Sequence, residues 1–407
     1  MRGTVGWYGP VMSDLSALAG NRLDDAIRLR RELHAHPELG LDLPRTQERV
    51  LDALDGLPLH IRRGTATTSV VGVLDGDRPG PTVLLRADMD ALPMPENADV
   101  DYASTIDGTM HACGHDLHTA MLVGAAHLLT AQRKQLHGRV LFMFQPGEEG
   151  GGGAKVMLDE GLLEGVGDIK AAFAIHVASN VPSGLIAAKG GTQMASADEF
   201  SIVIRGRGGH ASMPHDALDP IPTACEIVLA LQTMITRRVS VFDPAVLTVG
   251  NIFSGTTTNV IPETATIRGT MRAVSERTRN LLHGELRRVA EGIASAHSAE
   301  VTVTINEGYP VTINNVIEAA RALDVARNLV GPKLVYEMPT PVMGAEDFSY
   351  VLQRVPGVMV NLGACPPNIA HHEAAPNHSN RALFHEEAMV TGMALHTAMA
   401  LHHLAPA

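Results

Sequence analysis

The segment Thr82-Val-Leu-Leu-Arg-Ala-Asp-Met-Asp90 shows the pattern on which the fold prediction depends. It begins as a continuous apolar run and ends in two carboxylates. Similar runs occur at residues 70–74, 140–144, 171–175 and 358–362. Strands that are buried on both faces of a parallel sheet have runs of this kind, whereas half-exposed strands alternate. We therefore expect all five segments to be buried parallel strands.

Helical patterns lie between and beside these runs. They cover residues 116–132 and 154–163, and a further helix is expected at 23–36, ending before Pro37. An Ala-, Met- and Leu-rich helix over 386–404 closes the chain. Alternating helices and strands predict an α/β fold with a mostly parallel sheet, of the phosphorylase/hydrolase-like kind.

The stretch 188–306 has a different order of elements. We predict strands at 200–205, 246–253, 264–273 and 301–305, and helices at 217–238 and 275–297. This β-α-β-β-α-β order is that of a ferredoxin-like unit. We therefore expect a small α+β domain over 188–306, inserted into a larger domain made of 1–187 and 307–407.

Composition excludes several classes of protein. The 407 residues are 45% hydrophobic and 19% charged, which excludes a disordered chain. The net charge of −12 argues against nucleic acid or an anionic membrane as the partner. Three cysteines indicate a reducing compartment. No apolar run has the length of a membrane helix, and residues 1–12 lack a signal-peptide core, so we expect a cytoplasmic protein.

Metal-binding and acidic side chains follow the predicted strands. Ligands bind outside the carboxyl ends of the strands in open α/β sheets, so these groups are expected at one edge. They are Asp88 and Asp90, Glu148 and Glu149, His176, and the three histidines His371, His372 and His378.

The densest cluster is Met110-His-Ala-Cys-Gly-His-Asp116. Gly114 allows Cys113 and His115 to turn toward one point, and thiolate and imidazole are good ligands for zinc, manganese or iron-like ions. The alternative is that Cys113 is a small buried hydrophobe. Asp116 is expected to cap the helix that follows.

The pair Glu148-Glu149 follows a strand exit. In an extended segment adjacent side chains point to opposite sides, so one carboxylate would bind a metal while the other reaches an attacking water. A solvated acidic turn is the alternative. His118, on the predicted helix, is expected to be structural.

Three polar residues of the inserted domain are candidates with open alternatives. His210 lies in the glycine-rich turn Gly208-Gly-His-Ala-Ser-Met-Pro214 and either donates a hydrogen bond at a site or has no role. Asn259 is equally ambiguous. Arg272 either holds a substrate carboxylate with its planar guanidinium group or is solvated.

With these motifs the chain resembles the M20 family of metallopeptidases, in its amidohydrolase branch. That branch includes hippurate hydrolases, N-acyl-amino-acid amidohydrolases and indoleacetyl-amino-acid hydrolases. The motifs occur in the family's order from about residue 25 to 390. They are Arg31-Glu-Leu-His-Ala-His-Pro-Glu38, Arg86-Ala-Asp-Met-Asp-Ala-Leu-Pro93, Met110-His-Ala-Cys-Gly-His-Asp116, Phe144-Gln-Pro-Gly-Glu-Glu149, Gly208-Gly-His-Ala-Ser212, Gly344-Ala-Glu-Asp-Phe-Ser349 and Asn377-His-Ser379.

The resemblance implies a two-metal catalytic domain and a lid domain that also dimerises. Glu148 would be the general base, and Asp90 would belong to the catalytic set. His210 would reach the partner protomer's site and hold the oxyanion, and Asn259 and Arg272 would contact substrate. The implied metal ligands are Cys113, which would bridge two ions, and His115, Glu149, His176 and His378.

The predicted function is cleavage of the amide bond of N-acyl amino acids to a carboxylic acid and an amino acid. Two divalent ions per subunit, Mn²⁺ or Zn²⁺, and a homodimer or higher homo-oligomer are implied. A non-catalytic metal-stabilised interaction protein and a metal-dependent hydrolase of another bond, such as a phosphoesterase, are the alternatives. The loop 363–376, with Cys365 and the His371-His372 pair, departs from the family pattern.

Overall fold

The computed structural model describes residues 9–404, and their side chains from Asp14 onward. These residues form two compact units. The first comprises the chain up to Gln193, Ile313–Thr340 and the chain from Tyr350; the second comprises Met194–Thr312 and Pro341–Ser349. The predicted boundaries at 188 and 306 lie a few residues earlier. That Pro341–Ser349 belongs to the second unit was not predicted. This segment joins the unit by a contact distant in sequence, because the Ala195 N–H donates to the carbonyls of Val342 and Gly344.

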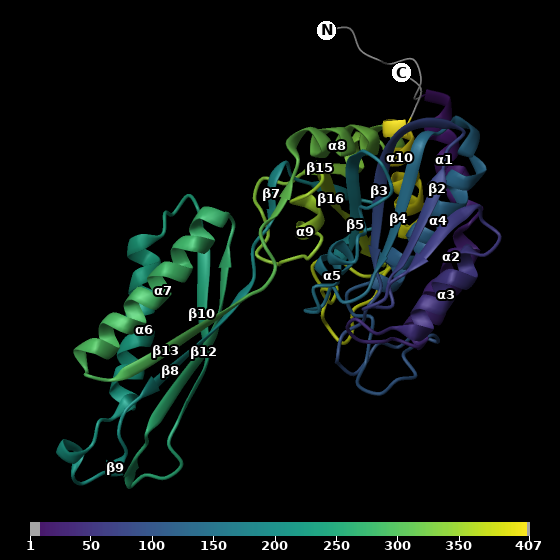
Figure 1. Ribbon diagram of the computed structural model, residues 1–407. Coiled ribbons are helices and arrows are strands. Elements are labelled where there is room, and N and C mark those ends of the chain that lie inside the picture. Colours follow the sequence, from purple (N-terminus) through teal and green to yellow (C-terminus); the bar gives the residue numbers. More distant parts are fainter. Residues whose placement is uncertain (1–8, 405–407) are drawn as a thin grey trace. The chain divides into compact units, whose positions relative to one another are not determined.

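The first unit contains one large sheet with helices packed on it (Figure 1). Its helices are α1 (Gly9–Gly20), α2 (Leu23–Ala35), α3 (Pro44–Leu54), α4 (His115–Ala131), α5 (Gly153–Asp159), α8 (Val316–Val330) and α10 (Ala388–Leu404), and the short α9 (Ser349–Leu352) begins at the boundary. Its sheet strands are β1 (Leu59–Arg63), β2 (Val70–Asp75), β3 (Arg78–Asp88), β4 (His137–Gln145), β5 (Ile169–Pro182), β6 (Ile186–Ala188), β15 (Val335–Glu337) and β16 (Gly357–Cys365).

The strand order of this sheet is β1-β2-β4-β3-β5-β16-β6-β15. The four central strands β4, β3, β5 and β16 are parallel to one another, so their carboxyl ends share one edge. Their apolar stretches are buried continuously rather than alternately, because protein covers both faces. The predicted mostly parallel α/β sheet is confirmed at its centre.

The prediction was wrong for one strand. β2, predicted to be parallel at 70–74, runs antiparallel to β4. Only two residues separate β2 from β3. A parallel pair needs a crossover of about a dozen residues or more, so β3 cannot return in the direction of β2.

The second unit has the predicted β-α-β-β-α-β order. Its main elements are β8 (Asp198–Arg205), α6 (Pro220–Arg238), β10 (Ala245–Ser254), β12 (Thr264–Ala273), α7 (Glu276–Ala296) and β13 (Glu300–Glu307). They form an antiparallel sheet in the order β10-β12-β8-β13, which is the ferredoxin-like topology. A separate apolar cluster lies between this sheet and the two helices.

Two short strand pairs complete the description. β9 (Gly209–His210) pairs with β11 (Val260–Ile261) in the second unit, and β7 (Gly191–Met194) pairs with β14 (Thr312–Asn314). Among the residues that the structure describes, no helix is both long enough and apolar enough to cross a membrane. Residues 1–8, which carry most of the signal-peptide argument, lie outside the described part of the chain.

Helices α4 and α10 pack against each other and against the central strands (Figure 1). Glycines bring the two helices close together. A Cβ atom on Gly124 of α4 would lie 2.1 Å from the Met393 sulfur, and one on Gly392 of α10 would lie 1.9 Å from the Met121 sulfur. Each helix thus presents a methionine to a glycine of the other. This packing fixes α4, whose first residue is His115.

We predict that buried His396 on α10 makes the fold sensitive to acid. The ring packs edge-on against Phe173, its Nδ1 has no hydrogen-bond partner among residues 9–404, and burial lowers its pKa to about 3. The unfolded chain therefore binds one more proton between about pH 6.5 and 3, and stability falls by up to about 1.4 kcal/mol per pH unit as the pH drops through this window. In His396→Leu, measured by denaturant unfolding from pH 7.5 to 4.5, this part of the slope should disappear.

The exposed His371→Leu serves as the control, because its substitution should leave the pH dependence of unfolding unchanged. Equal slopes for wild type and His396→Leu would contradict the prediction.

Candidate metal centre

Five predicted ligands meet at the edge where the central parallel strands end. Cys113 and His115 stand at the start of α4, Glu149 follows β4, His176 lies within β5, and His378 lies in the loop after β16. Their positions follow directly from the parallel arrangement of β3, β4, β5 and β16.

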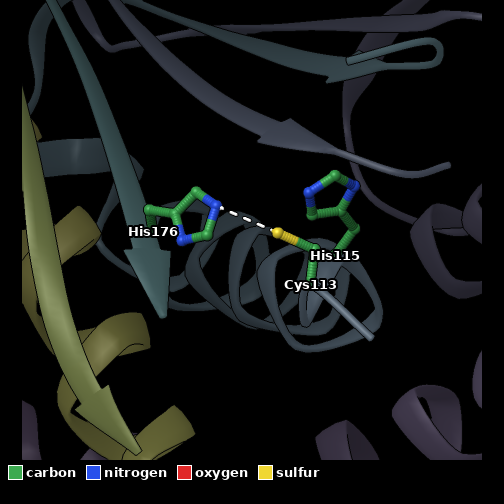
Figure 2. Close-up of side chains that lie close together, drawn as sticks. All are labelled: Cys113, His115 and His176. Carbon is green, nitrogen blue, oxygen red and sulfur yellow. Dashed lines mark hydrogen bonds between the residues drawn. The ribbon is translucent and has the colours of Figure 1, made fainter. Parts of the chain in front are cut away.

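The ligand atoms are separated by distances suited to a shared ion. The Cys113 sulfur lies 3.4 Å from His176 Nε2 and 3.2 Å from His378 Nε2. Figure 2 shows the thiol between the rings of His176 and His115. Glu149 Oε1 lies 3.1 Å from His378 Nε2 and 3.9 Å from His115 Nε2. Two ligands of one tetrahedral zinc lie about 3.3–3.8 Å apart, which follows from metal–ligand bonds of about 2.0–2.3 Å.

The imidazole tautomers also fit a metal. His115 Nδ1 lies 2.8 Å from the carbonyl oxygen of Asp90, and His176 Nδ1 lies 2.8 Å from that of Val177. A ring that donates its Nδ1–H to a carbonyl presents a lone pair at Nε2, as metal-binding histidines do. His115 Nε2 is buried and has no hydrogen-bond partner in the described residues. A buried imidazole nitrogen whose lone pair accepts no hydrogen bond is a ligand atom that a cation would bind.

Asp90 holds this arrangement together. Its Oδ1 accepts the backbone N–H of Glu148 and its Oδ2 accepts that of Glu149, both at 2.9 Å. Its carbonyl is the partner of His115 Nδ1. Both carboxylate oxygens are therefore engaged with the backbone, and Asp90 positions the acidic pair and the imidazole.

The conformation predicted for Glu148-Glu149 was wrong. The two residues lie in a turn and not in an extended segment, because Gly147 takes a positive φ of 73° and Asp90 draws both following amides toward one carboxylate. Consequently the two side chains do not point to opposite sides. One carboxylate oxygen of each lies within 4.8 Å of the other and of an imidazole nitrogen of His115.

The backbone conformation at residue 114, between Cys113 and His115, requires a glycine. Its φ is +87°, and a Cβ atom there would lie 2.4 Å from a methyl group of Val177. His378 is also left-handed, with a φ of 66°, although it is not glycine. Such a conformation costs about 1–3 kcal/mol and persists where surrounding contacts fix it. Here the His378 N–H donates to the Ala112 carbonyl.

The ionisable groups of the cluster shift one another's pKa values. Burial alone would raise the pKa of the Cys113 thiol, but His176 and His115 outweigh it and hold that pKa well below its ordinary value. Hydrogen bonds to Cys113 and Glu149 raise the pKa of His378 to about 10. Burial raises the pKa of Glu149. Protons and a divalent cation compete for these atoms, so the affinity for the cation will depend on pH.

A second buried layer lies behind the ligands. Asp88 forms an ion pair with Arg86 at 2.7 Å and a hydrogen bond with His118 Nδ1. His118 Nε2 accepts the Val177 N–H at 2.8 Å. Both nitrogens of His118 are therefore engaged, which supports the expected structural role. Burial would raise the pKa of Asp88, but Arg86 and the histidines keep it well below its usual range.

Asp116 does not cap the helix, contrary to prediction. The N-cap of α4 is Gly114, and no side chain caps it. The Asp116 carboxylate is buried and lies 2.7 Å from Arg30 Nε and 2.8 Å from His34 Nδ1. Charged partners supplied by α2 outcompete the backbone amides.

Sequence reasoning missed Asn377. Its side-chain amide donates to the carbonyls of Cys113 and Val177, and its oxygen accepts from Ser179. In the sequence, Asn377 belongs to the motif Asn377-His-Ser379, but only His378 of that motif was given a role.

Other predicted residues of the same loop do not join the cluster. His371 and His372 are exposed and stack edge-to-face on each other. Cys365 is buried at the end of β16, where its sulfur lies near backbone carbonyls. Neither the two histidines nor Cys365 belongs to a group of potential ligands among the residues described.

In the second unit, two of the three predicted residues are neighbours. His210 on β9 pairs with Val260 on β11, and the Asn259 carbonyl accepts the N–H of Ala211. The exposed His210 ring shares a hydrogen bond of 2.7 Å with Ser212. Arg272 lies near the far end of β12, eight residues beyond Thr264, or about 26 Å along the strand. The structure does not bring Arg272 together with His210 and Asn259.

The chain is similar to known proteins over nearly its whole length. The model of peptidase family M20/M25/M40 matches residues 84–402. Thermostable carboxypeptidase 2 of Saccharolobus solfataricus is 38% identical over 93% of this chain and 95% of its own. IAA-amino acid hydrolase ILR1-like 2 of Arabidopsis thaliana is 38% identical over 94% of this chain and 85% of its own. The crystal structure of the Bacillus subtilis YXEP protein, a dinuclear metal binding peptidase from the M20 family, is 32% identical, with a TM-score of 0.81, over 95% of this chain and 99% of its own.

The chain therefore belongs to peptidase family M20/M25/M40. It is a metal-dependent hydrolase of amide or peptide bonds. The predicted family and reaction class are confirmed.

Proposed function

We propose that this protein hydrolyses the amide bond of N-acyl amino acids and releases a carboxylic acid and a free amino acid. The observation that carries the proposal is the convergence of Cys113, His115, Glu149, His176 and His378 on one sheet edge, with the Glu148 carboxylate beside them. The names of two relatives, a carboxypeptidase and an IAA-amino acid hydrolase, both denote reactions that release an amino acid.

The same residues support a site for two divalent ions. The five proposed ligands fall into two of the groups of potential ligands in the described residues, Cys113 with His115 and His176, and Cys113 with Glu149 and His378. Cys113 belongs to both groups and would be shared. Five ligands with one soft sulfur fit Zn²⁺ or Mn²⁺ better than Mg²⁺, which prefers oxygen. When bound, such ions acidify water and polarise a carbonyl oxygen.

Glu148 would carry the proton. It is 7% exposed, its backbone N–H is held by Asp90, and one of its carboxylate oxygens lies within 4.8 Å of ligand atoms of His115 and Glu149. It would accept a proton from the water that attacks the amide carbon and deliver it to the leaving nitrogen. The C–N bond breaks, the carbonyl carbon keeps the water oxygen, and the amine leaves neutral.

The second unit would complete the site as a lid and dimerisation domain. His210 is exposed on a short strand and free to face another surface. We propose that it donates a hydrogen bond to the oxyanion in the partner protomer, with Asn259 beside it, and that Arg272 binds a substrate carboxylate.

The function is tested by amine release from a panel of N-acetyl, benzoyl, indoleacetyl and long-chain acyl amino acids. Purified protein is assayed with Mn²⁺ or Zn²⁺ and again after chelation. Metal-dependent release from at least one acyl class is expected. If folded, metal-loaded protein cleaves a phosphate ester instead, or releases nothing from any substrate, the phosphoesterase or the non-catalytic alternative replaces this proposal.

Substitutions of the two adjacent carboxylates should have different effects on turnover and on metal binding. Glu148→Gln should bind metal normally while kcat falls by about 10²–10⁴-fold, because a general base contributes about that factor. Glu149→Gln should instead bind metal more weakly, because it removes a ligand. Metal content by mass spectrometry, measured alongside kcat, distinguishes the two effects. Near-normal turnover in Glu148→Gln would rule out its role as the base.

If His210 acts in the partner protomer, inactive His210→Ala and inactive Glu148→Gln chains should complement each other. Random 1:1 exchange makes half of the dimers mixed, with one intact site of two, so about a quarter of the wild-type activity should return. Exchange is verified by native mass spectrometry. An absence of recovery in proven heterodimers would show that His210 does not act across the interface.

A further inference from the structure

We propose that Asn377 is a positioning residue for the metal centre: it orients three ligands, mainly through backbone carbonyls and also by a long contact of 3.9 Å from its Nδ2 to the Cys113 sulfur, and takes no part in the reaction itself. The inference rests on the ligand set proposed above. Asn377 directly precedes His378 and belongs to the loop after β16. Its side chain reaches two other segments of the chain that carry proposed ligands.

The first segment is the loop before α4. Asn377 Nδ2 donates to the Cys113 carbonyl at 3.0 Å. This bond holds the backbone of the residue whose sulfur lies between His176 and His378. Because Gly114 follows immediately in a left-handed conformation, the Cys113 carbonyl has no helical partner of its own, and the amide supplies one.

The second segment is the end of β5. Asn377 Nδ2 also donates to the Val177 carbonyl at 2.9 Å. The same carbonyl lies 2.8 Å from His176 Nδ1. The acceptor that sets the tautomer and orientation of His176 is thus held in place by Asn377. Partners of this kind, one step removed from the ligands, determine where the ligand atom points.

The amide itself is held rigidly. Asn377 Oδ1 accepts from the Ser179 N–H at 2.9 Å, and the Ser179 hydroxyl, 3.1 Å away, is shared with the nearer Ala375 carbonyl at 2.7 Å. With its oxygen facing the Ser179 N–H and its nitrogen facing two carbonyls, only one orientation of the amide satisfies the network. The residue after it is His378, whose positive φ is therefore set between the Asn377 network and the hydrogen bond to Ala112.

The substitution Asn377→Asp tests this role. It keeps the size and the acceptor but replaces the two N–H donors with an oxygen that repels both carbonyls. A matched control is Asn314→Asp. The buried Asn314 likewise donates to two carbonyls, those of Lys189 and Met359, and accepts the Met359 N–H, but it contacts none of the proposed ligands.

The measurement is divalent-metal affinity, by competition of the full-length chain with a chelating dye, together with the thiolate absorption of Co²⁺-loaded protein. We expect Asn377→Asp to bind Zn²⁺ about 10–100-fold more weakly than wild type and to shift the Co²⁺ spectrum. Asn314→Asp should lose thermal stability while it keeps wild-type affinity and spectrum. Wild-type affinity and spectrum in Asn377→Asp would overturn the proposal, as would equal weakening in both variants.

A milder variant covers the case in which Asn377→Asp does not fold. Ser179→Ala keeps the N–H donor to Asn377 Oδ1 and removes the hydroxyl, which lies 2.7 Å from the Ala375 carbonyl and 3.1 Å from Asn377 Oδ1 and so ties the Asn377 loop to β5. It should weaken Zn²⁺ binding by a few-fold, and unchanged affinity would then overturn the proposal. A separate measurement shows whether the proposed ligand set itself is wrong. In that case Cys113→Ala would bind Zn²⁺ as wild type does.

Discussion

The site depends on the hydrogen bonds of one buried carboxylate. Asp90 stands just past β3 and joins three chain segments at once: its side chain accepts the amides of Glu148 and Glu149, and its carbonyl faces His115. Residues delivered by β3, β4 and α4 therefore share one anchor. Without it, the parallel sheet would still bring these segments to one edge, but their side chains would not be held in a common orientation.

The electrostatics of the cluster follow from this dense packing. A thiol, carboxylates and imidazoles are gathered within 4.8 Å of one another in a largely buried region, where an unpaired charge is costly. Behind the ligands, the buried charge of Asp88 is matched by Arg86 and His118. A cation bound at the cluster would in the same way offset the negative charge of the thiolate and carboxylate ligands.

The sequence predicted the features that depend on local pattern. The central strands and the limits of β12 follow from hydrophobic periodicity, and the meeting of Glu149, His176 and His378 at one sheet edge follows from their places after predicted strands. It did not predict features decided by distant partners. The direction of β2 depends on a short connection, the turn at Glu148 depends on Asp90, and Asp116 is drawn away from helix capping by Arg30. Asn377 could not be recognised, because its partners are about 200 or more positions away.

The reciprocal packing of α4 and α10 has a consequence for how the sequence can change. Gly124 faces Met393, and Gly392 faces Met121, with no room for an added carbon at either glycine. A side chain at one position therefore demands a smaller one at its counterpart, so these positions should covary in pairs during evolution. Because α4 begins at His115, the C-terminal helix α10, which carries none of the proposed ligands, fixes the position of His115 at the sheet edge.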